Sequence, residues 1–128
     1  MSKQIIKTNN APAPIGPYNQ AVSAAGLLFV SGQVAIHPQT NELVVSSIKA
    51  ETIQVLENLK AVLTAAGVGF ENIVKTTIFL SDMALFAEVN EIYGSYFRGD
   101  YPARETVAVK TLPKNLNVEI SAIATLSL

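Results

Sequence analysis

The segment Ile73-Val74-Lys75-Thr76-Thr77-Ile78-Phe79-Leu80 decides the fold class. Its residues are mostly β-branched or aromatic at odd and even positions alike, a pattern typical of a strand covered on both faces. Ser81 and Asp82 follow directly and can cap a helix. A strand that passes straight into a helix indicates a sheet with helices packed on it, not an all-α or all-β protein.

Two helices are predicted, one on each side of this strand along the chain. Before the strand, apolar residues recur every three or four positions through residues 48–66, where Ser46 or Ser47 can cap the start and Gly67 can close the end. After the strand, a second helix ends at Gly99, and its apolar stripe consists of Phe86, Val89, Tyr93, Tyr96 and Phe97.

The remaining segments predict strands. Residues 18–23 and 27–33 form a predicted hairpin with its turn at Gly26, and residues 106–111 and 118–126 are the last two strands. We expect the order strand-strand-strand-helix-strand-helix-strand-strand, in which one of the three strands before the first helix is not assigned to particular residues. This order predicts an α+β fold in which one mixed sheet carries both helices on a single face. The opposite face of the sheet then has no cover within the chain.

The composition predicts that a second copy of the chain covers that face. With 128 residues the chain has the size of one domain, which we place at residues 1–128. Its residues are 49% hydrophobic and 15% charged, against roughly 25% charged in an average soluble protein, and its mean hydropathy is +0.33. No run approaches the roughly 18 apolar residues of a membrane-spanning helix, and the first residues do not resemble a secretion signal. We therefore expect an obligate oligomer in the cytoplasm, without a membrane partner.

Charge and residue usage exclude several function classes. Nine Lys and Arg against ten Asp and Glu give a net charge of −1, so nucleic acid is not expected as a partner. The chain has no cysteine and a single histidine, His37, which lies in a turn-like segment. A thiolate nucleophile, a histidine-based triad and a two-histidine metal site are therefore excluded within one chain. Any chemistry must use Arg, Glu, Tyr, Ser, Thr, Asn and backbone groups.

A few polar residues stand out against this apolar background. Arg104 precedes an apolar strand and suits two-point binding of a carboxylate, although a structural ion pair is the alternative. Glu119 lies in an otherwise uncharged strand, where it is exposed on a sheet face, paired with a cation, or retained to hold a water or a proton. Asn90 interrupts the stripe of the second helix and would need partners if buried, such as a loop backbone. Tyr18 and Ser31 could orient a ligand at a sheet edge, or could be structural.

The motifs of the chain together resemble those of the reactive-intermediate deaminase family, also known as the RidA or YjgF family. The resemblance runs from about residue 5 to residue 125, and the joint order and spacing of its motifs are more specific than any one of them. These motifs are Ala13-Pro14-Ile15-Gly16-Pro17-Tyr18-Asn19-Gln20-Ala21, Val30-Ser31-Gly32-Gln33, Val74 to Leu80, Phe86 with Val89-Asn90 and Tyr93, Pro102-Ala103-Arg104, and Val118-Glu119-Ile120 with Ile123-Ala124.

The resemblance implies a fold, an assembly and an activity. The fold is chorismate-mutase-like, and the assembly is a homotrimer in which three sheets form a central barrel, the helices lie outside, and ligand clefts lie between subunits. The activity is hydrolysis of 2-imino acids, chiefly 2-iminobutanoate and 2-iminopropanoate, to 2-oxo acids and ammonia. These imines arise from pyridoxal-phosphate-dependent dehydratases. Neither a cofactor nor a metal is implied.

The resemblance also implies roles for single residues. Arg104 corresponds to the arginine that grips the substrate carboxylate, and Glu119 to the acid that positions the attacking water and helps to move its proton. Tyr18, Ser31 and Asn90 correspond to residues that line the cleft. This assignment agrees with the chemistry, because a protonated imine already attracts water and needs no strong nucleophile.

Two positions depart from the family pattern. Many members have cysteine where this chain has Thr106, at a position whose backbone contacts ligand and water, and a small residue where this chain has Glu105. Strand alternation predicts that Glu105 points away from the face of Arg104 and Thr106.

Other functions stay open from the residues alone. A non-catalytic trimer could bind small carboxylates in the same cleft, although a pure binder has little use for Glu119. A ribonuclease would need a basic groove, which the charge balance does not provide. A chorismate mutase would need more than one well-placed cation, and Arg98 and Arg104 are the only arginines.

Overall fold

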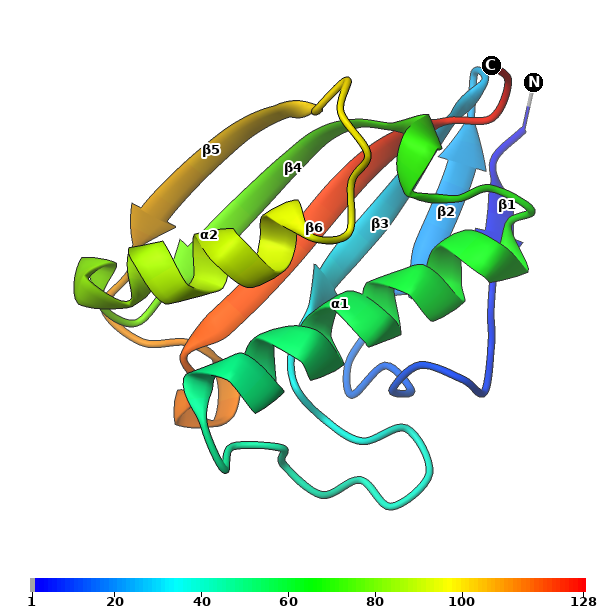
Figure 1. The fold of residues 1–128 in the computed structure, drawn as a ribbon. Coiled ribbons are helices and arrows are strands. Elements are labelled where there is room, and N and C mark those ends of the chain that lie inside the picture. The colour runs from blue at the N-terminus through cyan, green and yellow to red at the C-terminus, as the bar shows by residue number, and fades with distance from the viewer. Residues whose placement is uncertain (1) are drawn as a thin grey trace.

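A computed structural model describes residues 2–128 and consists of one six-stranded sheet and two α-helices (Figure 1). The strand order across the sheet is β1-β2-β3-β6-β4-β5. The elements in chain order are β1 Gln4–Ile6, β2 Ala21–Ala24, β3 Leu27–Gln33, α1 Ile48–Ala65, β4 Ile73–Leu80, α2 Phe86–Gly94, β5 Ala103–Ala108 and β6 Val118–Thr125.

The sheet is mixed, as predicted. All neighbouring strands pair antiparallel except β4 and β5, which are parallel and are joined through α2. Both helices lie on the same side of the sheet (Figure 1). The predicted element order and the arrangement of two helices on one face are therefore confirmed.

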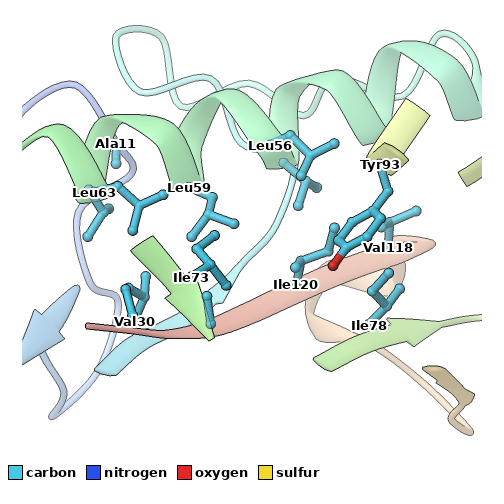
Figure 2. Packing of buried hydrophobic residues seen from close by; sticks show 14 of the residues in the cluster. Ala11, Val30, Leu56, Leu59, Leu63, Ile73, Ile78, Tyr93, Val118 and Ile120 are labelled. Carbon is cyan, nitrogen blue, oxygen red and sulfur yellow. The ribbon is translucent and has the colours of Figure 1, made fainter. Parts of the chain in front are cut away.

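The core lies between α1 and the sheet. Ser47 caps α1, its side chain accepting a hydrogen bond from the Ala50 amide, and Gly67 follows the helix with a φ of +79°. Figure 2 shows Leu56, Leu59 and Leu63 of α1 pointing toward the strands. Opposite them lie alternate residues of the strands, among them Val30, Ile78, Val118 and Ile120.

Three predicted boundaries were wrong. The first hairpin strand begins at Ala21, not at residue 18, because Tyr18 lies in a turn in which its amide donates to the Gly16 carbonyl. The second helix ends at Gly94, so Tyr96 and Phe97 lie beyond it, and their rings instead pack around Phe70. The strand predicted at residues 106–111 is β5, Ala103–Ala108. The charged pair at 104 and 105 hid its start, which pairing with β4 sets.

The face of the sheet opposite the helices has no cover within residues 2–128. Phe29 and Val107 are each 44% exposed on it, and the residues of β4 that face this side are only half-buried. The strand at 73–80 is therefore buried on one face only, instead of on both. Among the described residues no helix is long and apolar enough to cross a membrane.

Candidate active site

The candidate residues line two separate clefts. The first, which we call the glutamate cleft, has a volume of about 420 Å³ and contains Tyr18, Ser31 and Glu119. Its other lining residues are mostly apolar: Pro12, Ala13, Ile15, Gln20, Gly32, Gln33, Val34, Ile36, Pro113 and Lys114. The second, the arginine cleft, has a volume of about 440 Å³ and is lined by Asn90, Tyr93, Gly94, Tyr101, Pro102 and Arg104.

Glu119 lies half-buried on the uncovered face of the sheet. Its neighbours Val118 and Ile120 face the core, so alternation along β6 turns Glu119 to the other side, together with Ser121, Ile123 and Thr125. Within residues 2–128 no cation lies at ion-pair distance from it. Burial raises the pKa of the Glu119 carboxyl above its ordinary value. Of the three environments expected for this residue, the structure excludes a paired cation within the described chain.

Ser31 and Tyr18 lie at the same cleft but are held differently. The Ser31 hydroxyl donates a 2.6 Å hydrogen bond to the Asn19 carbonyl, which leaves its oxygen free to accept a bond from a ligand. Tyr18 is 48% exposed at the edge of the cleft. Both residues therefore line the same cleft as Glu119, although Tyr18 lies in a turn and not in the strand predicted for it.

A buried glutamine, which the sequence analysis missed, shapes this cleft. The Gln20 side chain accepts a bond from the Thr8 amide and donates to the carbonyls of Thr8, Ala11 and Pro12. It thereby fixes the proline-rich wall of the cleft against β2. Its only sequence signal is a long polar side chain directly before an apolar strand.

Arg104 is held by α2 in the arginine cleft. Its Nη1 donates a 2.7 Å hydrogen bond to Asn90 Oδ1. The guanidinium carbon lies 5.5 Å from the centre of the Phe86 ring and 5.1 Å from that of Tyr93. These contacts leave other N–H groups of the guanidinium available for a carboxylate. Asn90 is exposed, and not buried as its place in the apolar stripe suggested, because its partner is this surface arginine.

Tyr93 links this cleft to the core. Its hydroxyl shares a 2.7 Å hydrogen bond with the buried Thr76 hydroxyl of β4. Burial raises the pKa of Tyr93, while the bond to Thr76 and the charge of Arg104 act in the opposite direction. The hydrogen bond to Thr76 therefore fixes the position of the Tyr93 ring, on which the Arg104 guanidinium lies.

The two positions that depart from the family pattern lie on opposite faces of β5. Thr106 is on the same face as Arg104, and its buried hydroxyl has no hydrogen-bond partner among the described residues. Glu105 points to the uncovered face, as predicted, and forms a 2.8 Å ion pair with Lys75. Lys75 lowers the pKa of the Glu105 carboxyl through a hydrogen bond and its charge. Glu105 is therefore kept away from Arg104.

A single chain does not bring Arg104 and Glu119 together. Arg104 pairs with Thr76 on the helix side of β4, whereas Glu119 pairs with Phe79 on the uncovered side. The two residues are two strands apart across the sheet and three residues apart along it, so their Cα atoms are about 14 Å apart. Their side chains point to opposite faces of the sheet. The glutamate cleft and the arginine cleft are thus separate within one protomer.

A second missed residue, Glu51 of α1, anchors the strand that carries Glu119. Its carboxylate is 1% exposed and accepts bonds from the Asn117 amide at 2.7 Å, the Val118 amide at 3.1 Å and Asn117 Nδ2 at 3.0 Å. The available signal was its position, three residues after Ile48 and four before Val55, on the apolar stripe of the helix.

No metal centre is formed by the described residues, since nowhere in 2–128 do three or more His, Asp or Glu side chains gather. The groups available for chemistry are one guanidinium, one half-buried carboxyl, hydroxyls and an amide. Such a set can hold a small carboxylate and direct a water molecule at a neighbouring carbon.

Comparison with known proteins assigns the chain to a family. Residues 8–126 match the model of the Endoribonuclease L-PSP family. The chain belongs to this family, which is the RidA/YjgF family. The resemblance inferred from the motifs is therefore confirmed, as is the YjgF/L-PSP fold.

Family members of high similarity have differing names. A RutC family protein of Pyrococcus horikoshii is 51% identical over 95% of this chain and 97% of its own. The 2-iminobutanoate/2-iminopropanoate deaminase of Mus musculus is 48% identical over 95% and 90% of the two chains. A crystal structure of E. coli TdcF with bound serine superposes with a TM-score of 0.92 at 41% identity, covering 97% of this chain and 99% of that one.

Proposed function

We propose that this protein hydrolyses 2-imino acids, with 2-iminobutanoate and 2-iminopropanoate as the substrates, to 2-oxo acids and ammonia. The observation that carries the proposal is the division of the site. An arginine with unbonded N–H groups and a half-buried glutamate lie in two clefts, on opposite faces of a sheet whose uncovered face is apolar. A second copy packed on that face can bring its arginine cleft to the glutamate cleft of the first.

The assembly that joins the two clefts is a homotrimer in this proposal. Around a threefold axis every subunit gives its arginine cleft to one neighbour and its glutamate cleft to the other, so three identical sites close the ring. The uncovered sheet faces then meet at the centre, where they bury Phe29 and Val107. This assembly also accounts for the high hydrophobic fraction of a 128-residue chain.

The reaction needs only the groups that these clefts provide. Arg104 binds the substrate carboxylate through its free N–H groups, and Glu119 of the neighbouring subunit accepts a proton from a water that attacks the imine carbon. The substrate reacts as the protonated imine, so the C–N double-bond electrons move to nitrogen and a carbinolamine with a neutral amino group forms. Glu119 returns the proton to the amine nitrogen, the C–N bond breaks, and the hydroxyl becomes the carbonyl as its proton passes to Glu119, which releases it to the departing ammonia. Protonated imine and water thus become 2-oxo acid and ammonium.

The electrostatics of Glu119 support this role. A general base works best when its pKa approaches the operating pH, and burial shifts the pKa of Glu119 in that direction. The lack of a cation beside it within residues 2–128 leaves the carboxylate free to bind water. The deaminase name of the Mus musculus relative and the serine bound to E. coli TdcF, a small molecule with a carboxylate, support the substrate class.

The test generates 2-iminobutanoate with a threonine dehydratase and measures 2-oxobutanoate release with and without this protein. Wild type should accelerate release, whereas Arg104→Ala and Glu119→Gln should not. Arg98→Ala and Glu42→Gln, which change the same residue types on the exposed surface, are the controls. Undiminished turnover in Arg104→Ala would refute the mechanism. Binding of 2-oxobutanoate without any imine turnover would instead indicate a carboxylate-binding protein.

A mixing experiment tests the shared site. Arg104→Ala and Glu119→Gln subunits should each be inactive alone, but when they are co-expressed at equal amounts about one cleft in four combines an intact arginine with an intact glutamate. We expect about a quarter of wild-type activity from the mixture. A mixture as inactive as its parents would exclude an intersubunit site, and sedimentation as a monomer at micromolar concentration would exclude it independently.

A further inference from the structure

Strand β3 contains a β-bulge directly beside Glu119. Val30 pairs with Ala122 and Gln33 pairs with Ile120, so β3 advances three residues while β6 advances two. The extra residue makes Ser31 and Gly32 together oppose Ser121. Bulges of this kind change the direction of side chains and are frequent next to active sites.

Gly32 lies in contact with the whole end of the Glu119 side chain. A Cβ placed on Gly32 would lie 2.7 Å from Glu119 Cδ and 2.9 Å from Cγ, and closer still to Oε2. All three of its nearest atoms belong to Glu119. Gly32 is not among the glycines of positive φ, which are Gly26, Gly67 and Gly99. A glycine at position 32 therefore leaves room for the Glu119 side chain, and it is not needed for a left-handed backbone conformation.

The backbone of Glu119 cannot retreat from this contact. Val118 and Ile120 on either side have no exposed surface and pack in the core, and the Val118 amide is bonded to Glu51. Any group added at residue 32 must therefore push the Glu119 side chain and leave its Cα where it is. Because that side chain is flexible, the result is a moved carboxylate in a folded protein.

We propose that Gly32 is a positioning residue for Glu119: the bulge and the missing side chain hold the carboxylate against the β3 backbone, at the place from which it directs the attacking water. The activity part of this inference rests on the proposed imine hydrolysis. The contact between Gly32 and Glu119 does not depend on the proposed function, and measurements of folding stability alone can test it.

The activity test compares Gly32→Ala with Gly69→Ala. Gly69 is a matched control because a Cβ there would also crowd a glutamate, lying 2.5 Å from Oε1 of Glu71, but Glu71 is exposed and lines neither cleft. A carboxylate displaced by about 1 Å should reduce kcat/KM by about a hundredfold in Gly32→Ala. The affinity for 2-oxobutanoate should change little, since Arg104 is untouched, and the acidic limb of the pH profile should move to lower pH as the carboxylate meets water. Gly69→Ala should match wild type.

The folding test is a double-mutant cycle with Glu119→Ala, which removes the three atoms nearest to the new methyl. Gly32→Ala should lower Tm in the wild-type background and leave it unchanged in the Glu119→Ala background. An equal loss of Tm in both backgrounds, or failure to fold in both, would place the effect in the backbone and overturn the proposal.

The two proposals fail in distinguishable ways. If Glu119→Gln retains full imine turnover, the proposed function is refuted whatever Gly32→Ala does. If Glu119→Gln is inactive while Gly32→Ala keeps wild-type kcat/KM and pH profile, the function stands and the role of Gly32 is refuted.

Discussion

Removal of the buried carboxylate of Glu51 should destabilise the protein more than any other single change at a charged residue. In Glu51→Ala two backbone amides, those of Asn117 and Val118, and the Asn117 side chain lose their acceptor. A buried donor left unpaired costs about 1–3 kcal/mol. Because two of the three hydrogen bonds are only part-buried, we place the total loss in the lower half of the summed range, at about 3–5 kcal/mol. This is a large share of the roughly 5–15 kcal/mol by which domains are stable.

Glu51→Gln separates the loss of charge from the loss of acceptors. The amide oxygen of glutamine can still accept from both backbone amides. Its NH₂ group can donate to Asn117 Oδ1 if the Asn117 amide rotates by half a turn. Asn117 Nδ2 then donates to the Ser81 hydroxyl, which now donates to Asn117 Oδ1 at 2.7 Å. Only the charge assistance is then lost, and we expect about 1 kcal/mol.

Urea unfolding followed by circular dichroism, at one fixed protein concentration, measures both effects. With a slope of about 2 kcal/mol per molar urea, Glu51→Ala should lower the midpoint by about 2 M and Glu51→Gln by about 0.5 M. Glu57→Ala is the control, because Glu57 is an exposed carboxylate on the same helix that bonds only to Tyr96 among the described residues. A Glu51→Ala midpoint within 0.5 M of wild type, as an order-of-magnitude limit, would show that water satisfies the freed amides and would refute the reasoning.

Three further predictions follow from the two clefts. Tyr93→Phe keeps the ring under Arg104 but leaves the buried Thr76 hydroxyl without its partner, so the free energy of unfolding measured in urea should fall by about 1–2 kcal/mol. The affinity for 2-oxobutanoate should change little, and a large loss of affinity would contradict this prediction. Asn90→Ala frees Arg104 to move, and calorimetry should show 2-oxobutanoate binding weakened by about tenfold, whereas unchanged binding would mean that the rings alone hold the guanidinium. Burial raises the pKa of the Glu119 carboxyl above its ordinary 4.5, so its ionisation opposes folding, and the free energy of unfolding should fall as pH rises from about 4.5 through the raised pKa. Glu119→Gln should lack this decrease. An identical decrease in the variant would assign the effect to another group.

The elements were predictable where the local pattern is strong. The helix at 48–66 shows a hydrophobic period of three to four residues, the segment 73–80 is a run of β-branched and aromatic residues, and both elements exist within a residue of the prediction. The start of β5 was not predictable, because an edge strand with two charged residues shows no apolar alternation and is defined by its pairing with β4. The roles of Gln20 and Glu51 were not predictable from the local pattern, because their partners, mostly backbone groups, lie 8 to 67 residues away along the chain.

The candidate site, too, was only partly predictable from the sequence. Sequence motifs identified Arg104, Glu119, Tyr18, Ser31 and Asn90, and the family to which they point is confirmed. The motifs could not show that Arg104 and Glu119 lie on opposite faces of the sheet, since that depends on the register of three neighbouring strands.

The sequence by itself therefore determined the element order, the surplus of apolar residues and the residue types available for chemistry, because each is a local or compositional property. The tertiary structure decided which face of the sheet stays uncovered, that the two clefts are separate in one chain, and that Gly32 lies against Glu119. These depend on strand register and on one inserted residue in β3, where a shift of a single position turns a side chain to the other face of the sheet.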